Sequence, residues 1–391
     1  MNKTLLHTDI QNFINSNLHV DISRLLFKGS PFNNVSIQEL VEQIESRKRS
    51  EKKLSTWFRT PGIYYPNKRN IEQTSSEITA KYKAALMSGE TLIDLTGGFG
   101  VDAYYFSRSF KKVIHCEKNE ELAEIVQHNL KQLNVHTIIT VAGDGLSYLE
   151  KQQKHIDCIY VDPSRRDDTK GKVFLLKDSE PSVPDHLKTL FRFSETVLVK
   201  ASPLLDISTG INELECVSEI HVVAVANEVK ELLFLMKNGH EGAIQIKTVN
   251  IKNSGDEIFV SIYQKGGQAT YALPQKYLYE PNAAILKAGL FNEVSNNLNI
   301  SKLHINSHLY TSNKLISFPG RRFEVLEIIN YSSKEIKRAM PSLKANITTR
   351  NFPEPVSEIR KKTKLRDGGD RYLFFTTDMN DKHVVIICRK V

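Results

Sequence analysis

The sequence is poor in cysteine. Its four cysteines, Cys116, Cys158, Cys216 and Cys388, lie far apart and form no CxxC pair. This spacing argues against a zinc site and against a disulfide framework, so we expect a reduced protein. The histidines do not have the spacing of metal ligands either. The sequence therefore predicts no metal site.

Long hydrophobic runs are also lacking. The longest apolar runs, such as Val222–Ala226, fall far short of the roughly 20 residues that a membrane-spanning helix needs. The first dozen residues mix polar and acidic side chains, unlike a secretory signal. We therefore expect a cytoplasmic protein with no membrane span.

The composition is that of a soluble globular protein, with 40% hydrophobic and 25% charged residues. A length of 391 residues exceeds one ordinary core and predicts two or three domains. The net charge of +8 is unevenly placed, because residues 319–391 hold 16 Lys/Arg and 9 Asp/Glu, a net charge of +7. Such a local basic excess is typical of contact with a polyanion. The alternative is a solvated surface.

Residues 1–88 are predicted to form a helical N-terminal segment. One helix face is marked by apolar residues at helical spacing, Ile37, Leu40, Val41 and Ile44. Ser36 and Glu39 match the capping box that starts such a helix. A second helix is expected over residues 75–86.

From residue 91 short apolar runs alternate with helical stretches. The strands are predicted at 91–96, 112–117, 136–142, 155–162, 196–201 and 219–226. Apolar strands that alternate with helices indicate a parallel sheet covered on both faces. We therefore expect an α/β, Rossmann-like domain over residues 89–265. Residues 243–251 and 257–263 are expected to add a hairpin at the sheet edge.

A different pattern follows Gly266-Gly267. Residues 270–318 are predicted to form a small α/β linker subdomain, with helices over 277–289 and 291–298. Residues 319–391 are predicted to form a basic α+β module of ferredoxin-like character. Its strands are expected at 323–331, 345–352, 371–378 and 383–390, and its helices at 332–340 and 357–365.

A glycine-rich motif follows the first strand of the Rossmann-like domain. It reads Asp94-Leu95-Thr96-Gly97-Gly98-Phe99-Gly100. Glycines at this point let the backbone turn sharply and approach a ligand at the start of a helix. Residues 98–103 also satisfy G-x-G-x-x-A, a dinucleotide fingerprint. The motif alone therefore leaves NAD and S-adenosylmethionine open.

Acidic residues end the strands of this domain. Asp94 and Glu117 end the first two, Asp144 follows the third, and Asp162 ends the fourth. Ligands of open α/β sheets bind outside the carboxyl ends of the strands, so the four acids should face one crevice. They would repel a pyrophosphate but not the cationic sulfonium and amino groups of S-adenosylmethionine. Any one of them could instead be a helix cap or a solvated loop residue.

Together these motifs resemble a bacterial family of class I methyltransferases that carry a THUMP-like C-terminal domain. The resemblance is carried by DLTGGFGVDA at 94–103, EKN at 117–119, GDG at 143–145 and DPSRR at 162–166. It extends to residues 72–84 upstream and to KKTKLRDGGDRYLFFTT at 361–377. It implies that S-adenosylmethionine binds to Asp94, Thr96, Gly98, Gly100, Glu117 and Asp144. It also implies that the substrate is RNA.

The catalytic candidates lie in the motif that begins at Asp162. Methyltransferases of exocyclic amines have (D/N)-P-P-aromatic here, and the acid and a carbonyl beside the proline position the amine. This chain has Asp162 and Pro163, but then Ser164 and Arg165. Arg165 could stack on a base or bind a phosphate. Uracil-C5 chemistry is set aside, since no cysteine follows the fifth strand at residues 196–201.

Two groups of basic residues are candidates for binding the substrate. Arg166 and Lys200 lie at the mouth of the crevice, together with Lys170 and Lys172 in a long loop over residues 165–184 that could close over a substrate. The second group, on the predicted helix 357–365, contains Arg360, Lys361, Lys362 and Lys364. It could follow an RNA backbone without reading sequence. The alternatives are a solvated loop and a solvated helix face.

The sequence thus predicts an S-adenosylmethionine-dependent methyltransferase of an RNA base, with an exocyclic amine such as guanine N2 as a candidate acceptor. Three alternatives stay open. The first is a methyltransferase of a protein or small molecule. The second is a non-catalytic RNA-binding protein that binds S-adenosylmethionine. The third is a nicotinamide-dependent oxidoreductase, which the glycine motif alone permits.

Overall fold

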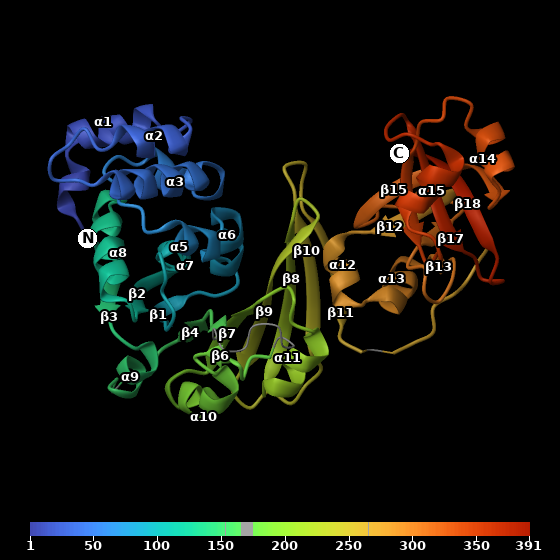
Figure 1. Cartoon of the computed structure of the whole chain (residues 1–391). Coiled ribbons are helices and arrows are strands. Elements are labelled where there is room, and N and C mark those ends of the chain that lie inside the picture. Colours follow the sequence, from blue (N-terminus) through green and yellow to red (C-terminus); the bar gives the residue numbers. More distant parts are fainter. Residues whose placement is uncertain (153, 166–174, 265) are drawn as a thin grey trace. The chain divides into compact units, whose positions relative to one another are not determined.

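The computed structural model describes residues 1–391 except 153, 166–174 and 265 (Figure 1). The chain forms two compact units. Unit 1 comprises Met1–Ser218 and Leu232–Gly242, and unit 2 comprises Glu219–Glu231 and Ala243–Val391. No helix among the described residues is long and apolar enough to cross a membrane.

The N-terminal segment of unit 1 is helical, as predicted. Its helices are η1 (Lys3–Leu6), α1 (Thr8–Ser16), α2 (Ile22–Lys28), α3 (Ile37–Lys53), α4 (Ser55–Arg59), α5 (Lys68–Gln73) and α6 (Glu77–Ala84). The predicted capping box starts α3: the Ser36 hydroxyl accepts from the Glu39 N–H at 3.2 Å, and the Glu39 carboxylate accepts from the Ser36 N–H at 2.8 Å. Figure 1 shows α1, α2 and α3 close together.

A mainly parallel sheet follows, with strand order β9-β7-β4-β1-β2-β3 in unit 1. The strands are β1 (Gly89–Asp94), β2 (Phe110–Glu117), β3 (Ile138–Ala142), β4 (Cys158–Val161), β7 (Thr196–Ala201) and β9 (Glu228–Lys237). The helices between them are α7 (Val101–Phe106), α8 (Glu120–Gln132), α9 (Gly145–Glu150), α10 (Val183–Phe193) and α11 (Ile207–Glu213). The predicted Rossmann-like alternation is confirmed. Strand β9, which runs antiparallel to β7, was not predicted.

The chain passes between the two units within β8 (Val217–Val225) and β9. In unit 2, β10 (Gln245–Ile251) runs parallel to β8, and β11 (Glu257–Ile262) runs antiparallel to β10. The predicted hairpin of β10 and β11 is therefore confirmed, with β11 at the edge.

A seven-stranded sheet forms the rest of unit 2, in the order β13-β14-β12-β15-β18-β17-β16. Its strands are β12 (Tyr277–Pro281), β13 (Ser301–Lys302), β14 (Tyr310–Ser312), β15 (Gly320–Asn330), β16 (Asn346–Arg350), β17 (Arg371–Thr377) and β18 (His383–Lys390). Helices α14 (Ser333–Ala339) and α15 (Val356–Thr363) pack on one face, where Ile336 and Ile359 join the core of Leu373, Phe375 and Val385.

The expected helix over 277–289 was wrong in its first half. Residues 277–281 form β12, and the helix α12 covers only Ala283–Ala288, followed by α13 (Phe291–Leu298). β12 is paired on both sides, with β14 and with β15. Buried aromatic and apolar side chains such as Leu278 and Tyr279 favour a central strand over a helix here. The helix begins after Asn282, whose side chain accepts from the Ile285 N–H.

Candidate functional site

A cavity of about 450 Å³ lies at the carboxyl ends of β1, β2 and β4 in unit 1. All four acids predicted to face one crevice line it, namely Asp94, Glu117, Asp144 and Asp162. They meet because parallel strands end at the same edge of the sheet. The volume is that of a small-molecule site.

The glycine loop after β1 lies close to the residues beneath it. Gly97 packs on the buried His115, whose Nε2 would lie 2.2 Å from a Cβ at that position. Gly98 lines the cavity with φ of +55°, in the left-handed region. Gly100 is not among the described residues that line the cavity, and it caps α7, where a Cβ would lie 2.8 Å from Val126. Burial lowers the pKa of His115, so its ring packs as neutral imidazole.

Thr96 joins the ends of β1 and β4. Its hydroxyl accepts from the Asp162 N–H at 2.7 Å, and its own N–H donates to Asp94 Oδ1 at 3.0 Å. These bonds fix the Asp94 carboxylate relative to the backbone of Asp162. Thr96 also lines the cavity. Its position is compatible with the predicted role in cofactor binding.

Glu117 is oriented by two backbone groups at the end of β2. Its Oε2 accepts from the Gly98 N–H at 2.8 Å and its Oε1 from the Asn119 N–H at 2.8 Å. The carboxylate is thereby tied to the glycine loop. Each oxygen keeps a further lone pair, which can accept a hydroxyl such as those of a ribose.

Asp144 caps α9 by accepting from the Ser147 N–H at 2.8 Å. Lys118 lies 3.7 Å from Asp144 and 2.5 Å from Glu180 of β6 (Ser179–Glu180), which also lines the cavity. Partial burial favours a higher pKa for Asp144, but the bonds from Ser147 and the charge of Lys118 outweigh it and lower the pKa. Asp144 is therefore an anion at neutral pH.

The carboxylates make the cavity strongly negative. Burial raises the pKa of Asp94 well above its usual range despite the bond from Thr96, and the charges of Asp102, Asp162 and Glu117 raise it further. A cationic ligand would relieve this repulsion, whereas a pyrophosphate would add to it. The carboxylates that line the cavity therefore fit S-adenosylmethionine and do not fit NAD.

A buried network that was not predicted from the sequence reaches the wall of the cavity, which Asp102 and Ser75 line. Asp102 of α7 accepts from the hydroxyls of Ser75 and Tyr160, at 2.8 and 2.9 Å, and lies 3.2 Å from the ammonium of the fully buried Lys83. Burial favours a raised pKa for Asp102, but the charges of Lys83 and Lys200 and these hydrogen bonds outweigh it, so its pKa is lowered. The only signal in the sequence was an acid in the first turn after the glycine loop.

The predicted catalytic segment begins with an ion pair between Asp162 Oδ2 and Lys200 Nζ, at the ends of β4 and β7. Pro163 and Lys200 both line the cavity. β5 (Ser164–Arg165) then pairs antiparallel with β6. The side chain of Arg165 lies outside the described part of the structure. So do Arg166, Lys170 and Lys172, and with them the middle of the predicted closing loop.

The predicted basic helix is α15 in unit 2. Three of its candidates each pair with an acid: Arg360 with Asp367 at 2.6 Å, Lys361 with Glu358 at 2.8 Å, and Lys362 with Glu354 at 2.8 Å. Lys364 is exposed and ends the helix with φ of +65°. The cluster is thus largely neutralised by neighbouring acids.

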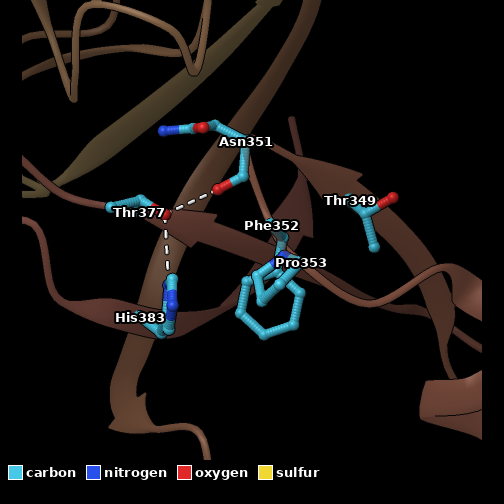
Figure 2. Close-up of a pocket in the computed structure, with 6 residues that line it drawn as sticks. All are labelled: Thr349, Asn351, Phe352, Pro353, Thr377 and His383. Atoms are coloured by element: carbon cyan, nitrogen blue, oxygen red, sulfur yellow. Dashed lines mark hydrogen bonds between the residues drawn. The ribbon is translucent and has the colours of Figure 1, made fainter.

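A second cavity, of about 480 Å³, lies in unit 2 and is lined by Thr349, Asn351, Phe352, Pro353, Thr377 and His383 (Figure 2). The Thr377 hydroxyl donates to the Asn351 carbonyl at 2.6 Å and lies 3.2 Å from His383 Nδ1. Since a hydroxyl has one proton, His383 Nδ1 must be the donor in the second bond. None of the predicted site residues lines this cavity.

Family models match three parts of the chain. The model described as conserved hypothetical protein 95 matches residues 64–180, a ferredoxin-like domain matches 277–319, and a THUMP domain-like model matches 320–390. No protein with a curated description matches the sequence.

Solved structures are also similar to the chain. A crystal structure from Porphyromonas gingivalis W83, described as a methyltransferase, is 32% identical, covers 100% of this chain and 99% of its own, and has a TM-score of 0.89. M. capricolum TrmK, in complex with S-adenosylhomocysteine, is 10% identical over 41% of this chain and 68% of its own, with a TM-score of 0.33. A Streptococcus mutans protein described as a methyltransferase, also with S-adenosylhomocysteine, is 14% identical over 41% and 96%, with a TM-score of 0.31.

The full-length match to the P. gingivalis protein and the family models confirm the predicted family, fold class and cofactor. The chain belongs to the class I methyltransferase family of that protein, uses S-adenosylmethionine as its cofactor, and has a THUMP-like domain over residues 320–390.

Proposed function

We propose that the chain methylates a base in RNA, with an exocyclic amine such as guanine N2 as the candidate acceptor. The observation that carries this proposal is the place of Asp162. It lines the same cavity as the cofactor-binding candidates Asp94, Glu117 and Asp144, at the end of the neighbouring strand β4. An acceptor that contacts Asp162 would therefore lie beside the cofactor.

Asp162 has the geometry to position an amine. Lys200 pairs with its Oδ2, whereas no donor among the described residues contacts its Oδ1. This oxygen can accept an amine N–H and then take the proton that the methylated amine loses. Pro163 stiffens the backbone at the cavity wall, where an adjacent carbonyl can accept the second N–H. S-adenosylmethionine, when bound, supplies an already activated methyl group, so positioning supplies much of the rate.

The charge of the C-terminal module supports RNA as the substrate. Its net charge of +7 over residues 319–391 favours a polyanion over a protein or a small neutral molecule. Arg165 and Arg166 follow Asp162 directly in the sequence, and we propose that they contact the same RNA. The roles proposed for Arg360, Lys361, Lys362 and Lys364 are weaker, because acids neutralise three of them.

The test is transfer of radiolabelled methyl groups from S-adenosylmethionine to total RNA from cells that lack this gene. The wild type would be compared with Asp162→Asn, which keeps the shape of the side chain but loses its charge. We expect roughly 100-fold or more loss of transfer in the variant, with binding of S-adenosylmethionine retained. Nucleoside analysis of the labelled RNA would identify the methylated atom.

Each alternative has its own outcome. If protein or small molecules are labelled but RNA is not, the substrate is a protein or a small molecule. Binding of S-adenosylmethionine without any transfer would support the non-catalytic alternative. Thermal stabilisation by NAD and not by S-adenosylmethionine would contradict the cofactor, because the acids of the cavity oppose a pyrophosphate.

A further inference from the structure

Two arginines converge on one buried carboxylate in unit 2. We call Glu280 of β12, Arg321 of β15 and Arg350 of β16 the Glu280 cluster. The Glu280 side chain is only 4% exposed. Arg321 Nε donates to its Oε2 at 2.5 Å, and Arg350 Nη2 donates to its Oε1 at 2.8 Å. The cluster therefore carries a net charge of +1.

The second arginine exceeds what charge balance requires. A buried carboxylate is neutralised by one cation, and a further cation adds its own cost of desolvation. Both arginines, however, keep part of their side chains in solvent, 40% for Arg321 and 37% for Arg350. The surplus positive charge is thus accessible to an anion.

The guanidinium groups are also held in place before any ligand binds. Besides Glu280, Arg321 contacts the Thr348 hydroxyl at 3.4 Å and lies over the Phe323 ring, 5.5 Å from its centroid. Arg350 Nη1 donates to the Thr349 carbonyl at 3.4 Å. Because these contacts fix the side chains, little conformational entropy is lost when an anion binds.

The chemistry favours a phosphate of a nucleic acid strand. Guanidinium groups bind phosphate oxygens through paired hydrogen bonds. On the same face the half-buried ring of Tyr372 packs against Phe323 at 5.1 Å. Positive charge beside an aromatic ring is the combination that single-stranded nucleic acids use. On α15, in contrast, three of the four candidate cations each form an ion pair with an acidic side chain.

We propose that Arg321 and Arg350 form a phosphate-binding site, positioned by Glu280, that holds a phosphodiester of the RNA substrate. The choice of RNA as the source of the phosphate rests on the proposed function. The site itself rests on the Glu280 cluster.

The test uses the full chain and a fluorescently labelled single-stranded RNA in anisotropy titrations. The triple variant Glu280→Gln, Arg321→Gln, Arg350→Gln removes both arginines without leaving a buried carboxylate unpaired, and it lowers the net charge by one. Lys337→Gln on α14 is the matched control, because Lys337 is exposed, is not one of the proposed binding residues, and its loss changes the net charge equally. Glu280→Gln alone keeps both arginines. Melting temperature and affinity for S-adenosylmethionine check that each variant is folded.

We expect RNA binding to weaken by roughly 10-fold or more for the triple variant and by less than about twofold for Lys337→Gln. Glu280→Gln should weaken it less than the triple variant does, because it keeps both arginines and loses only the carboxylate that positions them. A second arm measures thermal stabilisation by tripolyphosphate, which should occur in the wild type and not in the triple variant.

The outcomes separate the site from the proposed function. If the triple variant binds RNA as Lys337→Gln does, the site is overturned while the RNA function stands. If the wild type binds no RNA but tripolyphosphate stabilises it and not the triple variant, the anion site stands and RNA as its ligand is wrong. If neither probe binds the wild type, both proposals are overturned.

Discussion

At the scale of single residues, the charge of Asp94 couples the cofactor cavity to pH. Burial and neighbouring carboxylates raise its pKa well above the usual range. At pH values just above the ordinary pKa of aspartate, the folded protein therefore holds a proton on Asp94 that an exposed aspartate would have lost. A cationic cofactor prefers the ionised form, so its binding must release this proton.

We expect the affinity for S-adenosylmethionine to rise as pH increases from about 5 to about 7, by at most about tenfold per pH unit. The range ends at about pH 7 so that the amino group of the cofactor stays protonated throughout. Calorimetric titration at several pH values measures this slope. Asp94→Asn is the control, since it cannot ionise and should bind more weakly with a flatter profile. An equal slope in the two proteins would show that another group titrates.

The positions of the cavity acids could be predicted from the sequence, because strand ends are visible in the hydrophobic pattern. Asp94, Glu117 and Asp162 each close an apolar run, and parallel strands bring such ends together. The pair of Lys200 with Asp162 and the pair of Lys83 with Asp102 could not be predicted. Each joins elements whose separation depends on packing, for which a single sequence carries no periodic signal.

At the scale of elements, Gly320 allows β15 to approach β12. A Cβ at this position would lie 2.2 Å from the Glu280 carbonyl oxygen and 2.9 Å from the Asn282 nitrogen. Both are backbone atoms, which cannot rotate away as a side chain can. The pairing of Gly320 with Pro281 therefore needs a residue without a side chain.

Gly320→Ala is expected to destabilise the protein by roughly 2–4 kcal/mol through this overlap. Gly289→Ala is the matched control in the same unit, because Gly289 also has positive φ but has no neighbouring atom within 4 Å of the added Cβ. Its cost should be only about 1 kcal/mol, from the left-handed backbone. Chemical denaturation measures both. Equal losses would mean that the strands can separate at no cost.

Whether a segment forms a helix or a strand could be predicted where the residues at its ends agreed with the spacing of its apolar residues. The helix α3 has both an apolar face and a capping box, and both were found. The error at residues 277–281 arose because Tyr277-Leu278-Tyr279 is followed closely by a true helix, α12. Strand β9 was missed because it follows β8 directly, without the intervening helix that marked the other strands, although its run of Leu, Phe and Met over residues 232–236 is as apolar as theirs.

At the scale of the whole molecule, negative charge gathers in the cavity of unit 1 and excess positive charge in the C-terminal module of unit 2. The cofactor cavity in unit 1 is lined by carboxylates, whereas the basic excess lies in residues 319–391 of unit 2. Binding of one small cation displaces few counterions, so it depends only weakly on salt. Binding of RNA releases the counterions condensed on its phosphates and depends strongly on salt.

The two ligands should therefore respond differently to salt. From about 50 to about 300 mM KCl we expect log affinity for single-stranded RNA to fall against log salt with a slope of roughly −2 to −4, as for three to six phosphates. The affinity for S-adenosylmethionine should change less than about twofold over the same range. Anisotropy and calorimetry on the same protein preparation measure the two. The triple variant of the Glu280 cluster should lower the steepness by about one, since one phosphate contact is lost. A salt-independent RNA affinity would mean that the basic charges of unit 2 do not contact the phosphates, and any RNA binding would then have to come from base contacts alone.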